Sequence, residues 1–336
     1  MELTQREQFD FNNFCEKPVF VTDPADKDYP WHGGKWGNES WFVCANLNDN
    51  GHKIGFLAHA LILSMPGKGD MLSIKISISD QTTGWYKAYE SVYPAQAAEI
   101  SQTELLIKTK EFLMKGDLDE VIVQANMPDS KIDVVLKRTH SIFHLGGGQK
   151  FDFLGVEQYD FAIPAMETSG EVQIEGISYR VSGPTWIDRQ WGGLPNYYAK
   201  GDSAETRMKW LWMNLQLDNG VNISCGIILL IGPNIISQYA GIQLPDGSTA
   251  TGRISKLDMY DYWTSEESGN SYPTRYYMEI PCIDTKLEIQ ANPIAQEIVA
   301  QLKESTKYEG AADIKGTCMG KPVTGVNYIE LVGYWK

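Results

Sequence analysis

The sequence is poor in positive charge. Lysine and arginine together number 29 against 43 aspartate and glutamate residues, so the 336-residue chain has a formal net charge of −14. Proteins that bind nucleic acid neutralise its phosphates with clustered lysine and arginine, and this sequence contains no such cluster. We therefore expect no nucleic-acid partner, and the acidic balance chiefly favours solubility.

Cysteine and histidine are scarce, with five residues of each. The cysteines are Cys15, Cys44, Cys225, Cys282 and Cys318. No two of them form a CxxC pair, which argues against zinc-finger and thioredoxin-like chemistry, and their odd number and wide spacing indicate free thiols in a reducing compartment. His140 and His144 lie four residues apart, but a glycine triplet follows them, which argues against a helix. We expect no metal site.

Motifs for nucleotide binding and covalent hydrolysis are also missing. The glycine triplet at residues 146–148 lacks the lysine and serine or threonine that complete a phosphate loop, and no GxGxxG motif follows a strand. No GxSxG nucleophile elbow occurs, and no cysteine has the sequence context of a nucleophile. We therefore expect no cofactor.

Long apolar runs are absent. The longest, residues 227–231, is far too short to span a bilayer, and the polar start MELTQREQ lacks the apolar region of a signal peptide. We expect a cytoplasmic protein without a membrane span. The sequence does not indicate an oligomeric state.

Strand patterns dominate what is present. Apolar and polar residues alternate along residues 71–80, 120–126, 131–137, 170–181 and 209–217. The sequences MPDS (residues 127–130) and DNG (residues 218–220) are typical of turns between such segments. This alternation predicts an all-β fold, an antiparallel sandwich or barrel, and not βαβ units.

Helical patterns are few. SQTE at residues 101–104 has the form of a capping box, and the weak helical period of residues 105–114 predicts a helix there. Residues 294–303 fit either a short helix or a strand. The turn-rich stretch at residues 192–208 predicts a boundary between two domains, which we place at 1–195 and 196–336.

The segment WIDRQWGG at residues 186–193 is the most informative. It follows a strand-like run, so we expect a turn, and it places Asp188 and Arg189 between Trp186 and Trp191. Charges beside indoles are costly to bury unless they are paired or used. Asp188 is therefore either an acid–base group with its pKa moved towards neutrality or half of a structural pair with Arg189.

Two further residues have open roles. Glu39 precedes a strand-like segment that contains Trp41. Its role is either structural, as the cap of a turn or the partner of a cation, or functional, as an acid or base in an aromatic cavity. His59 lies in the strand-like residues 56–62 and is either a satisfied core residue or a catalytic acid.

Aromatic residues are plentiful, with ten tryptophans and seventeen tyrosines. Trp210 and Trp212 are two residues apart in a strand-like run, so their indoles share one face. The aromatic side chains either line a cavity for a bulky apolar ligand, where they would stabilise a developing positive charge, or fill the interior of a barrel.

Four segments, in this order, resemble a known family. They are residues 24–42, which end in ESWF; residues 176–192, with the pattern V.G..W.D..WG; residues 210–220, with W.W…QL..G; and residues 308–334, which end in GVNYIELVGY. On these segments the chain resembles the two-domain lipocalin-like (calycin-like) family of AttH-type proteins and carotenoid 1,2-hydratases. It resembles the fungal lipocalin-like Diels–Alderases more distantly.

The resemblance implies two lipocalin-like antiparallel β-barrels packed together, with a pocket in or between them. Characterised members add water to a polyene or guide a cyclisation without metal or nucleotide. In the carotenoid hydratases an aromatic residue two positions before the motif aspartate is implicated, which is Trp186 here. An upstream histidine is also implicated, but this chain has Tyr159 at that position, which weakens the case for carotenoid hydration.

We therefore hypothesise a metal-free lyase or isomerase of specialised metabolism acting on a large apolar polyene, terpenoid or polyketide-like substrate, by hydration, dehydration or guided cyclisation. Asp188 or Glu39 would donate a proton or hydrogen bond. The expected substrate-binding residues are Trp186, Trp191, Trp212, Tyr159, Trp41, Arg189 and His59, with Arg189 either orienting Asp188 or anchoring a substrate carbonyl. Glu330 is either a pocket carboxylate or, as we favour, an ion-pair partner between the barrels. The alternative function is a non-catalytic carrier of a hydrophobic small molecule.

Overall fold

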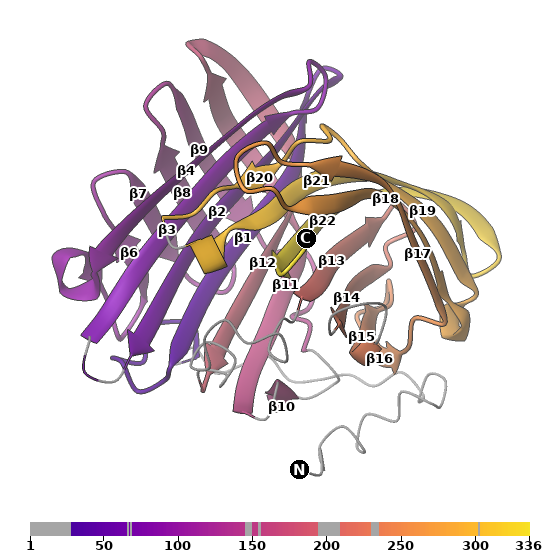
Figure 1. The fold of residues 1–336 in the computed structure, drawn as a ribbon, viewed down its shortest axis with the longest axis horizontal. Helices are drawn as coiled ribbons and strands as arrows, with labels where there is room; N and C mark the ends of the chain where they lie inside the picture. The colour runs from indigo at the N-terminus through magenta and orange to yellow at the C-terminus, as the bar shows by residue number, and fades with distance from the viewer. Residues whose placement is uncertain are drawn as a thin grey trace.

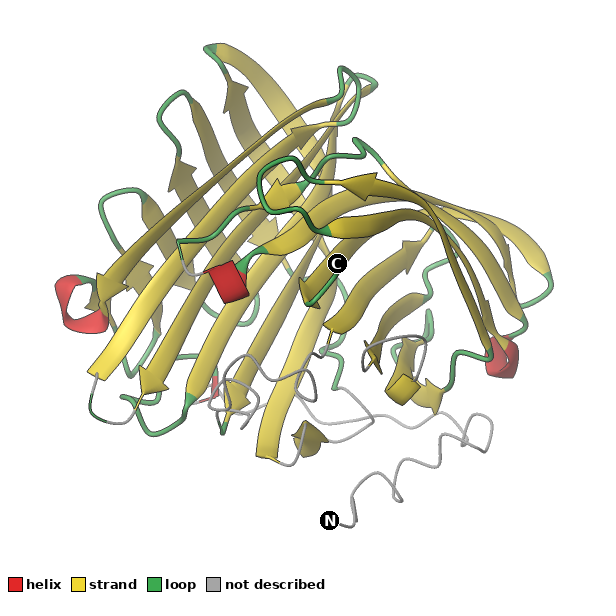
Figure 2. Cartoon of the chain, viewed as in Figure 1, coloured by secondary structure: helices red, strands yellow, loops and turns green. Residues whose placement is uncertain are grey.

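The computed structural model describes residues 28–336 except residues 66, 68, 145–149, 154–155, 194–208, 230–234 and 302. Regular structure in this part of the chain is nearly all β (Figure 2). Its helical elements include the short 3-10 turns η2 (Ala95–Ala97), η6 (Pro281–Ile283) and η7 (Lys303–Ser305). Across the described residues, no helix has the length and apolar character needed to cross a membrane. The predicted all-β fold with few short helices is confirmed.

Within the described residues, twelve strands form the first sheet. They are β1 (Asn38–Asp49), β2 (His52–Met65), β3 (Gly69–Asp80), β4 (Trp85–Pro94), β5 (Glu99–Ile100), β6 (Leu105–Lys108), β7 (Phe112–Gly116), β8 (Glu120–Asn126), β9 (Ser130–Lys137), β10 (Lys150–Phe153), β11 (Val156–Ile174) and β12 (Ile177–Gly192). Their order in space is β4-β3-β2-β1-β12-β11-β9-β8-β7-β6-β5, with β10 beside β11. β1 therefore lies between β2 and β12, which places the WIDRQW motif in the middle of the sheet.

The second sheet contains ten of the described strands. They are β13 (Lys209–Leu217), β14 (Asn222–Leu229), β15 (Ile235–Gln243), β16 (Thr249–Gly252), β17 (Lys256–Thr264), β18 (Ser271–Ile280), β19 (Thr285–Ala291), β20 (Glu297–Ile298), β21 (Lys307–Cys318) and β22 (Lys321–Gly333). Their order is β16-β15-β14-β13-β22-β21-β19-β18-β17, with β20 beside β21. Both sheets are antiparallel and curl around their own cores (Figure 1). This is the predicted arrangement of two lipocalin-like antiparallel units.

The two sheets pack face to face through β1, β2 and β3 of the first and β21 and β22 of the second. β1 is consequently buried on both faces: Trp41 points into the core of the first sheet, and Phe42 points into a separate apolar cluster that also contains Trp186 and Tyr328. A strand covered on both faces has a nearly continuous apolar sequence, as the middle of β1 has at residues 41–45 (WFVCA).

A glycine and a polar side chain determine how closely the two sheets pack and how they are held together. A Cβ added to Gly55 on β2 would lie 2.7 Å from the Cβ of Ala311 on β21, so only glycine permits this separation. The Asn46 side chain donates a hydrogen bond to the Asn327 carbonyl oxygen at 3.1 Å. These contacts fix the first sheet against the second and so define the space between them.

The predicted helix at residues 105–114 is wrong. The segment forms β6 and β7, with Leu105, Ile107, Phe112 and Met114 buried and intervening residues less so. The turn is closed by a hydrogen bond from the Thr109 amide to the Phe112 carbonyl oxygen at 2.8 Å. Burial of every second side chain outweighs the weak helical period.

Other expectations have mixed outcomes. Of residues 294–303, Glu297 and Ile298 form β20, which is the strand alternative. Cys44, Cys225 and Cys318 are free thiols, as predicted, whereas Cys15 lies outside the described residues. Most of the expected boundary stretch, residues 194–208, also lies outside them, so the division of the chain at residue 195 stays a prediction.

Candidate active site

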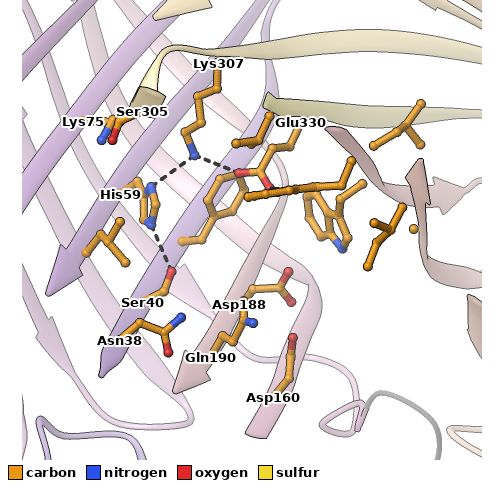
Figure 3. Close-up of a pocket in the computed structure, with 18 of the residues that line it drawn as sticks. Asn38, Ser40, His59, Lys75, Asp160, Asp188, Gln190, Ser305, Lys307 and Glu330 are labelled. Carbon is orange, nitrogen blue, oxygen red and sulfur yellow. Dashed lines mark hydrogen bonds and ion pairs between the residues drawn. The ribbon is translucent and has the colours of Figure 1, made fainter. Parts of the chain in front are cut away.

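A cavity of about 180 Å³ lies between the two sheets (Figure 3). Its walls come from β1, β2, β3, β11 and β12 of the first sheet and from β13, β14, β15, β21 and β22 of the second. Phe42 and Trp212 supply aromatic wall, and most of the polar residues labelled in Figure 3 lie along β1, β11 and β12 or around Lys307. Apolar walls with a few convergent polar groups are typical of small-molecule sites.

Strand β12 divides the WIDRQW motif between the two faces of the first sheet. Side chains alternate along a strand, so Trp186 and Asp188 face the second sheet, whereas Arg189 and Trp191 face the core of the first. The expected turn is therefore wrong, because the motif is the final part of a continuous strand. Of the two alternatives for Asp188, a structural pair with Arg189 is wrong, because neighbours along a strand point in opposite directions.

Asp188 is the predicted catalytic residue that lines the cavity. The Trp186 indole donates a hydrogen bond from Nε1 to Oδ1 of Asp188 at 2.9 Å. Burial raises the pKa of Asp188 to about 7 and the charge of Glu330 adds to this, while the Trp186 hydrogen bond opposes it. Asp188 can therefore gain or lose a proton near neutral pH.

A second carboxyl, Asp160 on β11, lines the cavity beside Asp188. Asp160 lies opposite Gln190 and Ala162 lies opposite Asp188, so the two aspartates are diagonal neighbours on one face, at a separation of about 7 Å for such positions. Burial raises the pKa of Asp160 well above its ordinary value, and the charge of Asp188 raises it further. The site thus contains two neighbouring carboxyls, and burial raises the pKa of both.

The other end of the cavity contains a buried ammonium group. Nζ of Lys307 pairs with Oε2 of Glu330 at 2.8 Å and with Glu309. Burial opposes the charge of Lys307, but the two carboxylates outweigh it and raise its pKa, so Lys307 is charged. Burial raises the pKa of Glu309 well above its ordinary value, whereas Lys307 and its hydrogen bonds hold that of Glu330 below its own. Glu330 is therefore ionised beside the charged Lys307.

His59 connects this end of the cavity to β1. Its Nε2 lies 2.9 Å from Oγ of Ser40, and its Nδ1 lies 3.5 Å from Nζ of Lys307 (Figure 3). Burial and then the charges of Lys307 and Lys75 lower the pKa of His59 well below its ordinary value. His59 is therefore neutral, and it lines the cavity as a hydrogen-bonding group.

Glu39 and Arg189 lie on the opposite face of the sheet from Asp188, in the first sheet's core. Nη2 of Arg189 and Oε2 of Glu39 are 2.7 Å apart, and both side chains are almost fully buried. The guanidinium lies over the rings of Trp41 and Trp191, at 4.1 and 4.9 Å from their centroids. Of the alternatives for Glu39, pairing with a cation is the one that the structure shows, and its expected role as an acid or base in an aromatic cavity is corrected.

The remaining predicted residues divide in the same way. Tyr159 stacks on Trp191 with ring centroids 5.4 Å apart, on the core side of the sheet. Trp212 lines the cavity and meets Phe42 edge to face at 5.5 Å. Glu330 also lines the cavity, and Lys307, its partner, lies in the same sheet, so it is the pocket carboxylate and not an ion-pair partner between the two units.

Sequence reasoning missed several groups in the cavity wall. They are Ser40, Lys75, Asp160 and Lys307. Asp160 could have been found, because it follows Tyr159 in a strand and must face the other side of the sheet. Lys307 had no comparable signal, because its place depends on how two sheets from distant parts of the sequence meet.

A metal-binding group is not evident. Within the part of the chain that the structure describes, no three histidine, cysteine, aspartate or glutamate side chains come together as possible metal ligands. Metal-free chemistry stays a prediction, and the residues of the cavity are considered below for what their own protons and charges can do.

Comparison with known proteins places this geometry in context. A family model described as AttH-like matches residues 27–334. The crystal structure of a putative AttH from Nitrosomonas europaea is similar over 95% of this chain and 99% of that chain, with a TM-score of 0.79 and 19% identity. Kievitone hydratase from Nectria haematococca is similar over 96% and 99%, with a TM-score of 0.74 and 21% identity. These likenesses show a shared fold.

One curated relative is similar in sequence. The dehydratase asqC of Emericella nidulans is 23% identical over 228 residues, which are 62% of this chain. The aligned part of this chain spans 60% of that protein, less than two thirds of its length.

Proposed function

The chain belongs to the AttH-like family, and from this premise we propose that it is a lyase that adds water to, or removes water from, a small organic molecule held between its two sheets. The observation that carries the proposal is the pair of neighbouring cavity carboxyls, Asp160 and Asp188, whose pKa values are both raised by burial. Water addition or elimination needs one acid and one base. The names of two relatives, a hydratase and a dehydratase, support the same class of reaction.

In the direction of dehydration, Asp188 acts as its carboxylate and removes a proton from carbon. The electron pair of that C–H bond becomes the second bond of the alkene as the neighbouring C–O bond breaks. Asp160 gives its proton to the departing hydroxyl, which leaves as water. The proton now on Asp188 returns to Asp160 directly or through a water molecule, and hydration is the reverse.

The size of the cavity limits what reacts in it. A volume of about 180 Å³ is smaller than the roughly 300–1,000 Å³ of pockets that enclose a drug-sized ligand. We propose that the cavity holds the reacting end of an apolar substrate, against Phe42 and Trp212. A polyene, terpenoid or polyketide-like molecule would extend beyond it.

The test is incorporation of labelled water. The protein is incubated in heavy-oxygen water with two probes, a prenylated phenol whose alkene is isolated and benzylideneacetone, whose alkene is conjugated to a ketone. Mass spectrometry follows formation of an alcohol in which the former alkene carries the labelled hydroxyl, with boiled protein as the control; exchange of the ketone oxygen of benzylideneacetone does not count as label gained. Absence of a labelled alcohol from both probes contradicts the proposed lyase activity on small alkenes.

The pH profile of kcat/KM for dehydration should have an acidic limb. Asp188 must be ionised to act as the base, so kcat/KM for dehydration should fall as the pH drops through about 7. It should fall again at higher pH, where Asp160 loses the proton that it donates. Initial rates across the pH range measure both limbs, and a profile without an acidic limb near pH 7 contradicts the role of Asp188.

Trp186→Phe should move that limb. The indole hydrogen bond favours the charged form of Asp188, so its loss should raise the pKa of Asp188 and shift the acidic limb upward by about one pH unit. Trp212→Phe is the matched control, because the Trp212 indole donates to Ser224 and not to Asp188. A limb that moves equally in both variants would assign the effect to packing.

A further inference from the structure

We infer that Ser40 binds a carbonyl oxygen of the substrate, so that the site takes an α,β-unsaturated carbonyl compound or the matching β-hydroxy carbonyl compound. This inference rests on the proposed lyase function and names the substrate class of the same cavity. Four features carry it: the charge on Lys307, the tautomer of His59, the direction of the Ser40 hydroxyl and its place relative to Asp188.

Lys307 fixes the tautomer of His59. A charged lysine has three donors and no acceptor, so the nitrogen of His59 that faces it, Nδ1 at 3.5 Å, must offer its lone pair. His59 is neutral, and a neutral imidazole carries one proton, which is then on Nε2. The charge of Lys307, held by Glu330, therefore orients a histidine from the other sheet.

The tautomer decides what Ser40 can do. With its proton on Nε2, His59 donates to Oγ of Ser40 at 2.9 Å and cannot accept the serine proton. Ser40 is therefore not an activated nucleophile, although a serine beside a histidine would otherwise indicate one. Its hydroxyl instead receives a hydrogen bond and can pass one on, polarised in the direction Lys307 to His59 to Ser40.

The Ser40 proton is available to a guest in the cavity. Ser40 is only partly buried and lines the cavity wall with Asn38, which lies two residues earlier on the same face of β1. Oδ1 of Asn38 is buried and has no hydrogen-bond partner among the described residues. A buried acceptor without a partner costs free energy, so this part of the wall is suited to a ligand atom that donates a hydrogen bond, such as the hydroxyl of a β-hydroxy carbonyl compound.

The position of Ser40 matches the carboxyl chemistry. Ser40 lies opposite Gln190 and Phe42 lies opposite Asp188, so Ser40 and Asp188 are diagonal neighbours on adjacent strands. A carbonyl oxygen at Ser40 would place the α-carbon of the same molecule towards Asp188. When Asp188 removes the α-proton, the electron pair moves onto the carbonyl oxygen as an enolate, and Ser40 stabilises the new charge. The pair then forms the alkene, and the β-hydroxyl leaves with the proton of Asp160 as water.

The test uses benzylideneacetone, whose near-ultraviolet absorption moves to longer wavelength when its carbonyl accepts a hydrogen bond. The probe should show this shift when bound to the wild-type protein, and tryptophan fluorescence should give its Kd. Ser40→Ala should abolish the shift and weaken binding about tenfold. Ser40→Thr, which keeps the hydroxyl, should retain the shift.

Two controls separate the hydroxyl from the general environment. Ser305→Ala removes another cavity serine and should keep the shift. The hydrocarbon in which a methylene replaces the ketone oxygen should bind equally to the wild type and to Ser40→Ala. Absence of the shift in the wild type, or its persistence in Ser40→Ala, would overturn the inference.

The labelling experiment keeps this inference distinct from the proposed function. Label gained by the prenylated phenol but not by benzylideneacetone would support the lyase and overturn the carbonyl substrate. Label gained by benzylideneacetone, with a loss in Ser40→Ala that Ser40→Thr restores, would support both. A Ser40-dependent shift without label in either probe would support carbonyl binding and contradict the lyase activity.

Discussion

Asp188→Asn is expected to lower kcat for water addition or elimination by roughly 10²–10⁴-fold, the usual contribution of a positioned acid or base. Asparagine matches aspartate in size, and its side-chain oxygen can still accept the hydrogen bond from Trp186. It cannot take up a proton, so the acidic limb near pH 7 should disappear together with the rate. Initial rates on whichever probe the wild type converts give the measurement.

Controls make the result specific to the cavity. Asp258→Asn changes an exposed carboxylate on β17 and should leave the rate unchanged. Asp160→Asn should lower kcat by a comparable factor and remove the fall at high pH. If Asp188→Asn turns over at the wild-type rate, the result would favour catalysis by shape alone. If the wild-type protein binds the probe but does not convert it, the result would favour the carrier function.

Stability gives an independent readout of the same carboxyl. The pKa of Asp188 is about 7 in the folded protein and 3.8 without its environment, so between these values the folded state binds more protons than the unfolded state. Its contribution to stability is therefore greatest at low pH and is lost as the pH rises through about 7. Asp188→Asn lacks this loss, so at pH 8 it should be at least as stable as the wild type although its activity is low.

The alternation of a strand explains which site residues the sequence could predict. Trp210 and Trp212 were predicted to share one face because they are two residues apart in a strand, and both line the cavity. A pair between Asp188 and Arg189 was one of two alternatives for a motif that was expected to form a turn. As a strand, the same six residues place Arg189 with Glu39 in one core and Asp188 with Asp160 in the cavity.

The rest of the site depends on contacts between distant segments. Lys307 reaches His59 across 248 positions of sequence, and no local pattern states that β21 packs on β2. The helix expected at residues 105–114 fails for the same reason, because burial against the first core decides its conformation. The fold class can be predicted from the alternation of apolar and polar residues and from the turn sequences, whereas the cavity depends on how the two sheets pack together.

Lys307→Met is expected to destabilise the protein by about 3–5 kcal/mol, because removing one partner of a buried ion pair leaves the other charge buried and unpaired. Glu330 is ionised and has Lys307 at 2.8 Å, and Glu309 also pairs with it. Lys53→Met is the matched control: it removes an exposed ion pair with Asp313 that also joins the two sheets, and such pairs contribute about 0–1 kcal/mol. Urea unfolding followed by tryptophan fluorescence compares the variants.

A second substitution distinguishes the lost charge from lost packing. Glu330→Gln added to Lys307→Met removes the carboxylate that the first change leaves unpaired, so the double variant should regain part of the lost stability. Equal destabilisation in the single and double variants would mean that the Lys307 side chain acts through its volume. In either variant Nδ1 of His59 has lost its ammonium donor, so the imidazole proton is free to move to Nδ1. The direction of the hydrogen bond between His59 and the Ser40 hydroxyl is then no longer fixed. A stable Lys307→Met, Glu330→Gln protein should therefore bind benzylideneacetone without the wild-type spectral shift, because the polarised chain to the carbonyl begins at the ammonium group of Lys307.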